Sequence, residues 1–476
     1  MPALWVVEDT EWRKIWWWQG FPHGWSGVTW LQSRKICICS TRRNATLWGS
    51  GGYATVGYIW PLGSTLCVVS NSICTATNMF CQVPTALLLL SGLVSSTAAS
   101  ATSVSRKRCQ HPSDKVLDGC PTGTIVVGQN NNPQAHFDSI QKAILSLPND
   151  SSSQTILILP GNYTGQLNVT RSGPLTLLGQ TRHPNKQAEN TVKVIYSNAT
   201  GYPGVTFDNT FTSVLTIAPT LNASYTGSGP TGFPVPSNTP FGNADFKVYN
   251  IDFHNLFAPR SAGPALVVSV SYANAGFYHS GFYSFQDTVY IGKLGNAVFY
   301  GGEIAGQTDF LYGFGTAWIE KTQLTLRNCG GGIIAWKGTN TTFENKYGCY
   351  VSKSRIEAAN ASIAQTIKGT CSLGRPWNSQ QRSVYLDTYM DASILPAGYT
   401  PWGNTPATAR VDHYTFMAEY KSSGPGFNLT ARLAGNLTKE LSAKEVKPYK
   451  SPVDVFMTPQ GKQPNIAWID QEYVKV

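Results

Sequence analysis

Two successive strand-and-turn units between Gly276 and Gly315 constrain the fold of this chain more than any other feature. Each apolar run ends at an aspartate, Asp287 in FQDTVY and Asp309 in QTDFLYG, and the two stand 22 residues apart. A repeat of roughly 20 to 50 residues is typical of a solenoid, and a period near 22 fits one coil of a parallel β-helix. Equivalent positions on successive coils stack about 4.8 Å apart. The spacing therefore predicts that the two carboxyl groups lie side by side.

Such a carboxyl pair has a chemical consequence. Two carboxyl groups this close share a proton, and one apparent pKa rises. The pair then supplies one carboxylate and one neutral acid near neutral pH, as acyl chemistry without a Ser/His/Asp triad requires. Asp is also a common turn residue, so the spacing alone leaves a purely structural role open.

Length and composition favour a turn-rich β protein. The 476 residues exceed the size at which one globular core stops growing, but a solenoid extends in one dimension. The chain has 45 Gly and 28 Pro and only 13% charged residues. Its net charge of +10 favours an anionic partner. Because no basic run is longer than Arg106-Lys107-Arg108, we do not expect a nucleic acid partner.

The first 78 residues differ from the rest of the chain. They hold nine of the fourteen Trp and four Cys without metal-site spacing. The apolar run 85–94 is too short to span a bilayer but suits the hydrophobic region of a signal peptide, with a cleavage site near residues 99–101. We interpret 1–78 as a non-native extension of the reading frame and 79–101 as a signal peptide starting at Met79. The alternative is a genuine N-terminal domain, and residues 79–84 lack the usual Lys or Arg.

Sequons and cysteines after residue 101 indicate a secreted, glycosylated chain. Asn-x-Ser/Thr sequons begin at Asn149, Asn162, Asn168, Asn198, Asn222, Asn340, Asn360, Asn428 and Asn436. The five remaining cysteines are an odd number, so at least one thiol stays unpaired. Cys109 and Cys120 flank a short loop, and we predict a disulfide between them.

The residues from 109 to 476 read as one domain. A helix is predicted to begin at Asp138, with Asp138 as its cap and Gln141 reaching back, and its apolar stripe would cover the open end of the solenoid. The segment 200–243, rich in Gly, Pro, Ser and Thr, reads as an excursion from the coil. Strands are predicted at 124–127, 156–159, 175–179, 193–197, 246–255, 265–271, 324–328, 348–356 and 383–390.

Three motifs in order, QDTVY, TDFLYG and LGRPW (373–377), resemble the pectin methylesterase, or pectinesterase, family. FDSIQKAILSLP, PGNYTGQLNV, PAGYTPW and SSGPG extend the resemblance over nearly all of the chain after residue 108. The resemblance implies an all-β, right-handed parallel β-helix with a short N-terminal capping helix. It also implies an enzyme, a carboxylic ester hydrolase, that converts methyl esters of homogalacturonan (pectin) to pectate and methanol.

The resemblance assigns roles to individual residues. Asp309 matches the nucleophile, Asp287 the acid/base and Gln286 an amide that stabilises the oxyanion. Arg375 matches a positioning cation, and Trp377 an aromatic wall of the sugar site. No metal or other cofactor is implied.

Aromatic residues beyond those motifs have two interpretations. Trp402 and Phe314 are candidates for stacking on sugar rings in the substrate site. Trp377, Trp402 and Phe314 are equally candidates for ordinary core packing, since Trp is usually well buried.

The chain departs from the family pattern at three places. A second oxyanion Gln is expected one coil before Gln286, and a 22-residue step leads to Pro264, which has no side-chain donor. Asn255-Leu256 replaces Asn-Thr, and Gly165 replaces a Glu. The departure at Pro264 keeps open a non-catalytic pectin-binding protein. A polysaccharide hydrolase or lyase on the same fold is a further alternative, although we find no cluster of acids suited to it.

The expected partner is methyl-esterified homogalacturonan, an anionic polysaccharide. We expect a monomer without nucleic acid and, once the signal is removed, without a membrane. The expected location is extracellular, at a cell wall, and the simple secretory signal favours a fungal source.

Overall fold

The computed structural model describes residues 105–476, except 228–231, 339–345 and 459–461, and the backbone of six strands between residues 4 and 56. The chain divides into two compact units, Met1–Thr85 and Ala86–Val476. The first unit has two three-stranded antiparallel sheets: β1 (Leu4–Glu8), β2 (Trp12–Trp17) and β3 (Val28–Gln32), then β4 (Cys37–Thr41), β5 (Asn44–Gly49) and β6 (Gly52–Val56). The signal segment 79–101 lies outside the described residues, and a start at Met79 stays a prediction.

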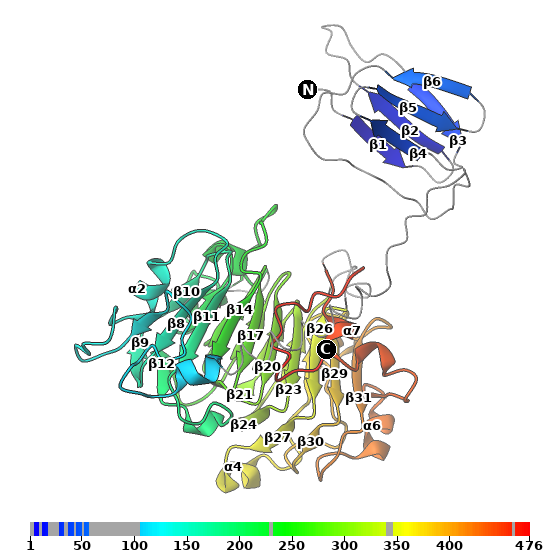
Figure 1. Ribbon diagram of the computed structural model, residues 1–476. Coiled ribbons are helices and arrows are strands. Elements are labelled where there is room, and N and C mark those ends of the chain that lie inside the picture. Colours follow the sequence, from blue (N-terminus) through cyan, green and yellow to red (C-terminus); the bar gives the residue numbers. More distant parts are fainter. Residues whose placement is uncertain are drawn as a thin grey trace. The chain divides into compact units, whose positions relative to one another are not determined.

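The second unit is a right-handed parallel β-helix of three sheets, as expected (Figure 1). The eleven-stranded sheet contains β7 (Ile125–Val127), β8 (Gln154–Ile158), β11 (Leu175–Gly179), β14 (Phe246–Tyr249), β17 (Asn274–Tyr278), β20 (Asn296–Tyr300), β23 (Thr316–Glu320), β26 (Gly348–Ser352), β29 (Arg382–Leu386), β31 (Phe416–Tyr420) and β32 (Lys439–Glu440). The eight-stranded sheet contains β9 (Gly161–Thr164), β12 (Val192–Tyr196), β15 (Ile251–Asn255), β18 (Gly281–Tyr283), β21 (Glu303–Thr308), β24 (Gln323–Gly330), β27 (Arg355–Ala358) and β30 (Tyr389–Met390). The seven-stranded sheet contains β10 (Leu167–Val169), β13 (Leu215–Ile217), β16 (Val268–Val270), β19 (Val289–Ile291), β22 (Leu311–Gly313), β25 (Ile334–Trp336) and β28 (Gly374–Pro376).

The core consists of apolar ladders inside the coil. Each coil places a strand in register with the strand of the coil before it, so inward positions repeat. Phe277 pairs with Phe299, Phe299 with Ile319, and Ile319 with Val351, and all four are buried. The rings of Phe277 and Phe299 stack with centroids 4.8 Å apart. Burial of each such side chain contributes about 1.5 to 3 kcal/mol, so the continuous core stabilises the whole solenoid.

Three predicted strands are each two strands in different sheets. The runs 246–255, 348–356 and 383–390 bend at Asn250, Lys353 and Asp387, whose φ angles are 54°, 48° and 47°. One left-handed residue turns the chain from the eleven-stranded to the eight-stranded sheet. Its N–H still binds the next coil, as from Asn250 to the Tyr278 carbonyl (3.1 Å). This bond offsets part of the cost of a left-handed non-glycine residue.

The predicted helix forms, but its cap differs. α2 (Ile140–Leu145) is capped by the Ser139 hydroxyl, which accepts the Lys142 N–H, and Asp138 instead pairs with the Lys142 ammonium. Gln141 does not reach back either, because its amide binds the backbone of Asn168 in the first coil. The stripe is buried against the core, so α2 covers the end of the solenoid (Figure 1). The other regular helices are short: α4 (Ala361–Thr366), α5 (Pro406–Ala409), α6 (Leu429–Gly435), α7 (Pro452–Val455), η1 (Gln187–Glu189), η2 (Asn209–Thr212), η3 (Leu221–Ser224) and η4 (Lys447–Tyr449).

The excursion 200–243 is partly a coil, because β13 within it joins the seven-stranded sheet. Its remainder is held by the buried carboxylate of Asp208, which accepts hydrogen bonds from the backbone N–H groups of Thr210, Thr226 and Phe233. The excursion also reaches the outer face of that sheet, where the Tyr290 hydroxyl donates to the Tyr225 carbonyl (3.0 Å). It therefore forms one wall beside the candidate active site.

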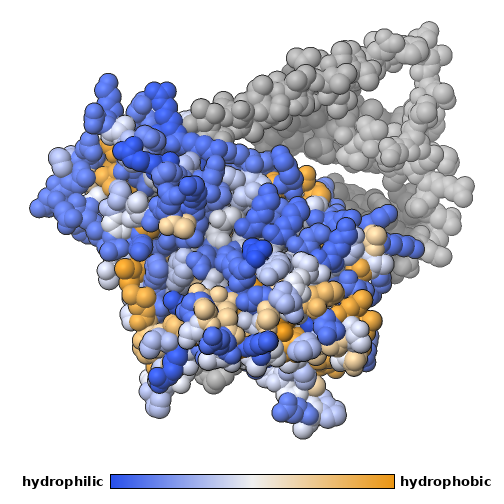
Figure 2. Space-filling view, turned by 90° about the horizontal axis from the view of Figure 1, so that it is seen from below, coloured by the Kyte–Doolittle hydropathy of each residue, from blue (hydrophilic) through white to orange (hydrophobic). Residues whose placement is uncertain are grey.

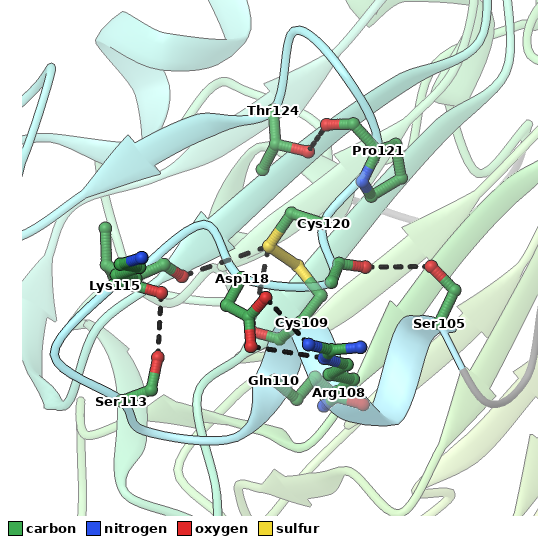
Figure 3. Close-up of a disulfide and its surroundings, with 12 residues drawn as sticks. Ser105, Arg108, Cys109, Gln110, Ser113, Lys115, Asp118, Cys120, Pro121 and Thr124 are labelled. Carbon is green, nitrogen blue, oxygen red and sulfur yellow. Dashed lines mark hydrogen bonds and ion pairs between the residues drawn. A yellow bond between two sulfur atoms is a disulfide. The ribbon is translucent and has the colours of Figure 1, made fainter.

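The predicted disulfide between Cys109 and Cys120 is confirmed (Figure 3). A second disulfide joins Cys329 to Cys371, and the fifth cysteine of this region, Cys349, is a buried thiol. The odd number of cysteines therefore leaves one unpaired, as expected.

The molecular surface is predominantly hydrophilic on the face shown in Figure 2, with hydrophobic residues in smaller separate patches. Apolar residues scattered in this way are normal on a protein surface. Within the part of the chain that the structure describes, no helix has both the length and the apolar character needed to span a membrane.

Candidate active site

Asp287 and Asp309 occupy equivalent places on successive coils, as their spacing predicted. Asp287 lies between β18 and β19, Asp309 lies between β21 and β22, and Val289 pairs with Leu311. Both aspartates are left-handed, with φ of 60° and 47°. The N–H of Asp287 donates to the Thr308 carbonyl (3.1 Å), and that of Asp309 donates to the Gly332 carbonyl (2.7 Å). The coil-to-coil hydrogen bonds thus hold both carboxyl groups at one corner of the solenoid.

Arg375 clamps the carboxylate of Asp309. Its Nε donates to Oδ1 (3.0 Å) and its Nη2 to Oδ2 (2.6 Å), while the Gly332 N–H also donates to Oδ1 (2.9 Å). Arg375 reaches this position because it pairs with Ala335, which pairs with Tyr312 on the coil of Asp309. Two-point contacts of this kind are strong and fix geometry. Asp309 is therefore the anionic member of the pair.

Asp287 has the opposite electrostatic character. Its side chain is only 8% exposed. Burial raises the pKa of Asp287 well above its usual value, the negative charge of Asp309 raises it further, and Arg375 opposes the shift. A carboxyl group with a raised pKa holds its proton toward neutral pH. The corner thus contains a neutral acid beside a carboxylate.

Gln286 lies directly before Asp287 and pairs with Thr308 of the next coil. Its Oε1 accepts a hydrogen bond from the Ser261 hydroxyl (2.7 Å). With the oxygen so engaged, the opposite end of the amide carries the N–H donors. The structure thus orients this predicted site residue.

The coil before Gln286 is 21 residues long, not 22, because Val268 pairs with Val289. The register equivalent of Gln286 is consequently Ala265, whose N–H donates to the Gln286 carbonyl (3.1 Å). The expectation for Pro264 is corrected by one position, but Ala265 also lacks a side-chain donor. The neighbouring Pro264 carbonyl accepts the Thr200 N–H (2.8 Å).

Aromatic rings and cations surround the carboxylates on the outer face of the seven-stranded sheet. Half-buried Trp377 lies 5.6 Å from Tyr312 between ring centroids. Trp402 contacts two guanidinium groups, with the Cζ atoms of Arg375 and Arg410 at 4.0 Å and 4.2 Å from its ring centroid. The structure therefore brings the predicted Trp377 and Trp402 together with Arg375.

Lys337 was not predicted from the sequence. Its Nζ lies 4.0 Å from the Trp377 ring centroid and 4.4 Å from that of Phe314, and it donates to the Thr226 carbonyl (2.9 Å). Burial lowers the pKa of Lys337 to about 8, although the charge of Asp208 acts in the other direction. This cation thus lies among the rings beside the carboxylate corner.

Tyr290 and Tyr312 also escaped sequence analysis, although a signal was present. Each follows an aspartate of the pair by three residues, in DTVY and DFLY. The two tyrosines pair in register, and their ring centroids lie 4.8 Å apart. The repeat that located the aspartates thus also marks an aromatic ladder.

Comparison with known proteins identifies the family. The model of the Pectinesterase family matches residues 226–457. "Probable pectinesterase A" of Aspergillus niger is 25% identical over 316 residues, covering 66% of this chain and 81% of that protein. "Pectinesterase" of Aspergillus aculeatus is 26% identical over 332 residues, covering 68% and 89%. This chain is a member of the pectinesterase family. The family match includes the whole carboxylate corner.

Solved structures of pectin methylesterases have the same fold. The enzyme from Aspergillus niger in deglycosylated form superimposes with a TM-score of 0.54 at 23% identity, covering 68% of this chain and 92% of that chain. PemA from Erwinia chrysanthemi gives 0.53 at 22% identity, covering 71% and 98%. The parallel β-helix is thus shared with pectinesterases from fungi and bacteria.

Proposed function

We propose that this protein is a pectin methylesterase, which hydrolyses methyl esters of homogalacturonan to pectate and methanol. The observation that carries the proposal is the pairing of a buried, proton-holding Asp287 with an Asp309 carboxylate clamped by Arg375. These are the two protonation states that ester cleavage by a carboxylate nucleophile requires. Membership of the pectinesterase family supports the choice of substrate.

In the first step, a carboxylate oxygen of Asp309 attacks the C6 carbonyl carbon of a methyl galacturonate. The electron pair of the carbonyl bond moves to its oxygen, and the amide of Gln286 donates to the resulting oxyanion. Collapse of the tetrahedral intermediate breaks the bond to the methoxy group. Asp287 protonates the departing oxygen, because methoxide is too basic to leave unaided. Methanol and an anhydride with Asp309 are formed.

In the second step, Asp287 is a carboxylate and acts as the base. It takes a proton from a water molecule that attacks the carbonyl carbon of the substrate. The anhydride bond breaks, Asp309 leaves as a carboxylate stabilised by Arg375, and the galacturonate carries a new carboxyl group. Asp287 is protonated again, so the pair returns to its starting state without any other reactant.

The surrounding rings and cations suit an anionic polysaccharide. Trp377 and Trp402 offer ring faces to sugar rings beside the nucleophile. Lys337 and Arg410 lie against these rings, and their positive charges would attract the free carboxylates of partly de-esterified pectin. The net charge of +10 acts in the same direction over longer distances.

We also propose that the natural protein is a secreted, glycosylated monomer of the cell wall environment, with a signal peptide at 79–101 and residues 1–78 outside its reading frame. Exposure of several sequon asparagines supports glycosylation; these are Asn149, Asn162, Asn222, Asn360, Asn428 and Asn436. Sequencing the N-terminus of the secreted protein would test the processing, and a mass decrease after removal of N-glycans would test the glycosylation.

The test of function is the identity of the product formed from highly methylated pectin. We expect methanol and new carboxylates in equal amounts, without new chain ends. Reducing ends would instead indicate a hydrolase, and unsaturated ends a lyase. A folded protein that binds pectin and forms none of these products would be a binding protein, and the proposal would be wrong.

A further inference from the structure

The loop 256–264, just before the coil of Gln286, lies against the carboxylate corner and is firmly held. The Asn255 side-chain amide donates to the carbonyls of Asn198, Thr212 and Leu266 at 2.9 to 3.1 Å. Gly263, at φ 133°, lies so close to Thr200 that an added Cβ would be 2.1 Å from its carbonyl oxygen. Both ends of the loop are thus fixed, and the residues between them are presented in a defined place.

Ser261 in this loop binds two side-chain amides at once. Its hydroxyl donates to Oε1 of Gln286 (2.7 Å), and its backbone N–H donates to Oε1 of Gln307 (3.1 Å). A backbone N–H can only donate, so it must face the oxygen of the Gln307 amide. The –NH2 groups of both glutamines are consequently turned away from Ser261. One residue therefore sets the orientation of both amides.

Gln307 lies beside the nucleophile. It belongs to β21, two residues before Asp309, and its N–H donates to the Phe285 carbonyl of the Gln286 coil (2.6 Å). Its Nε2 lies 3.6 Å from the place that a Cβ on Gly330 would occupy. Gln307 also lines one crevice with the glycines 330–332, and the last of these donates its N–H to Asp309. The Gln307 amide is thus a neighbour of the carboxylate corner.

We propose that Gln307 supplies the second amide donor to the oxyanion, in place of the donor that the preceding coil lacks at Ala265, and that Ser261 is the positioning residue for both amides. This inference rests on the proposed esterase function. Two donors fixed before the reaction stabilise the developing charge without reorganisation. The loop that carries Ser261 provides this fixation.

The test compares initial rates of methanol release from methylated pectin by the full chain and its variants. For Gln307→Ala we expect kcat to fall by about 10²-fold, as for loss of one oxyanion donor, with KM within twofold of the parent. Gln307→Glu retains the acceptor for Ser261 but no donor, so it should lose activity as well. Gln323→Ala, on the neighbouring strand β24 of the same sheet, is the matched control and should retain the parent rate.

Variants of Ser261 test the positioning role. Ser261→Ala keeps the N–H to Gln307 but loses the bond to Gln286, so kcat should fall on the order of tenfold at unchanged KM. Ser261→Thr restores the hydroxyl and should recover most of the rate. A folded Gln307→Ala variant with the rate of the Gln323→Ala control would overturn the inference alone. A parent that releases no methanol would overturn the proposed function and this inference together.

Discussion

Gly331 is the position at which one methyl group would separate the nucleophile from its clamp. Its φ is 61°, and an added Cβ would lie 2.5 Å from Oδ1 of Asp309 and 2.7 Å from Nη2 of Arg375. Ordinary contacts of a Cβ begin at 3.4 Å, so the Asp309 oxygen would have to move by roughly 0.9 Å. A misplacement of about 1 Å can cost a factor of about 10² in rate, or about 2.7 kcal/mol in activation free energy. We therefore expect Gly331→Ala to lower kcat/KM about 100-fold.

The control separates this collision from backbone strain. Gly123, before β7, also has a positive φ (82°), and nothing lies within 4 Å of its Cβ position. Both alanine variants bear about 1 to 2 kcal/mol of left-handed strain, which urea unfolding would measure. Only Gly331→Ala should lose methanol release. Equal activity of the two folded variants would refute the reasoning that Gly331 protects the Asp309–Arg375 contact.

Three further results are expected. The raised pKa of Asp287 means that its stabilising neutral form is fully present below about pH 4 and lost as pH rises through the folded-state pKa; Asp287→Asn should therefore gain stability over the parent by up to about 1.4 kcal/mol per pH unit in that window, and urea unfolding at several pH values showing a constant difference would contradict this. Replacing Cys329 and Cys371 by Ser should cost about 4 kcal/mol of unfolding free energy in the chain-entropy model and also lower kcat, because the bond ties the glycine run before Ile333 to the segment of Arg375; the same change at the distant first disulfide should leave kcat unchanged, and an equal kcat in both would contradict the link. With a pKa of about 8, Lys337 loses its charge above that pH, so the KM for partly de-esterified pectin should rise there in the parent, whereas a pH-independent KM would exclude this contact.

The fold could be predicted from the sequence because a coil repeats its apolar pattern at a nearly constant period. The corners could not. Asn250, Lys353 and Asp387 turn the chain between sheets without Gly or Pro, and their left-handed conformation is compensated by hydrogen bonds to the next coil. Such bonds depend on stacking and have no local signal. A one-residue variation in coil length likewise shifted the expected equivalent of Gln286 from Ala265 to Pro264.

The candidate site was predictable where its residues belong to one repeat or to one motif. Asp287 and Asp309 follow from the period, and Arg375 from LGRPW. Ser261 and Lys337 could not be found, because their positions depend on how a loop and an excursion fold back on the sheet. Even Arg375 reaches Asp309 only through an irregular coil, since its strand β28 starts 40 residues after β25, at Gly374 against Ile334.

The central claim is that Asp309 attacks the ester while Asp287 supplies the proton. Its most direct test is the initial rate of methanol release from methylated pectin by the parent, Asp309→Asn and Asp287→Asn at the same pH and with folding checked for each. The account predicts methanol from the parent and rates at least about 10³-fold lower from both variants, since acid/base groups contribute about 10² to 10⁴ and the nucleophile more. Parent-like release of methanol by a folded Asp309→Asn would contradict it.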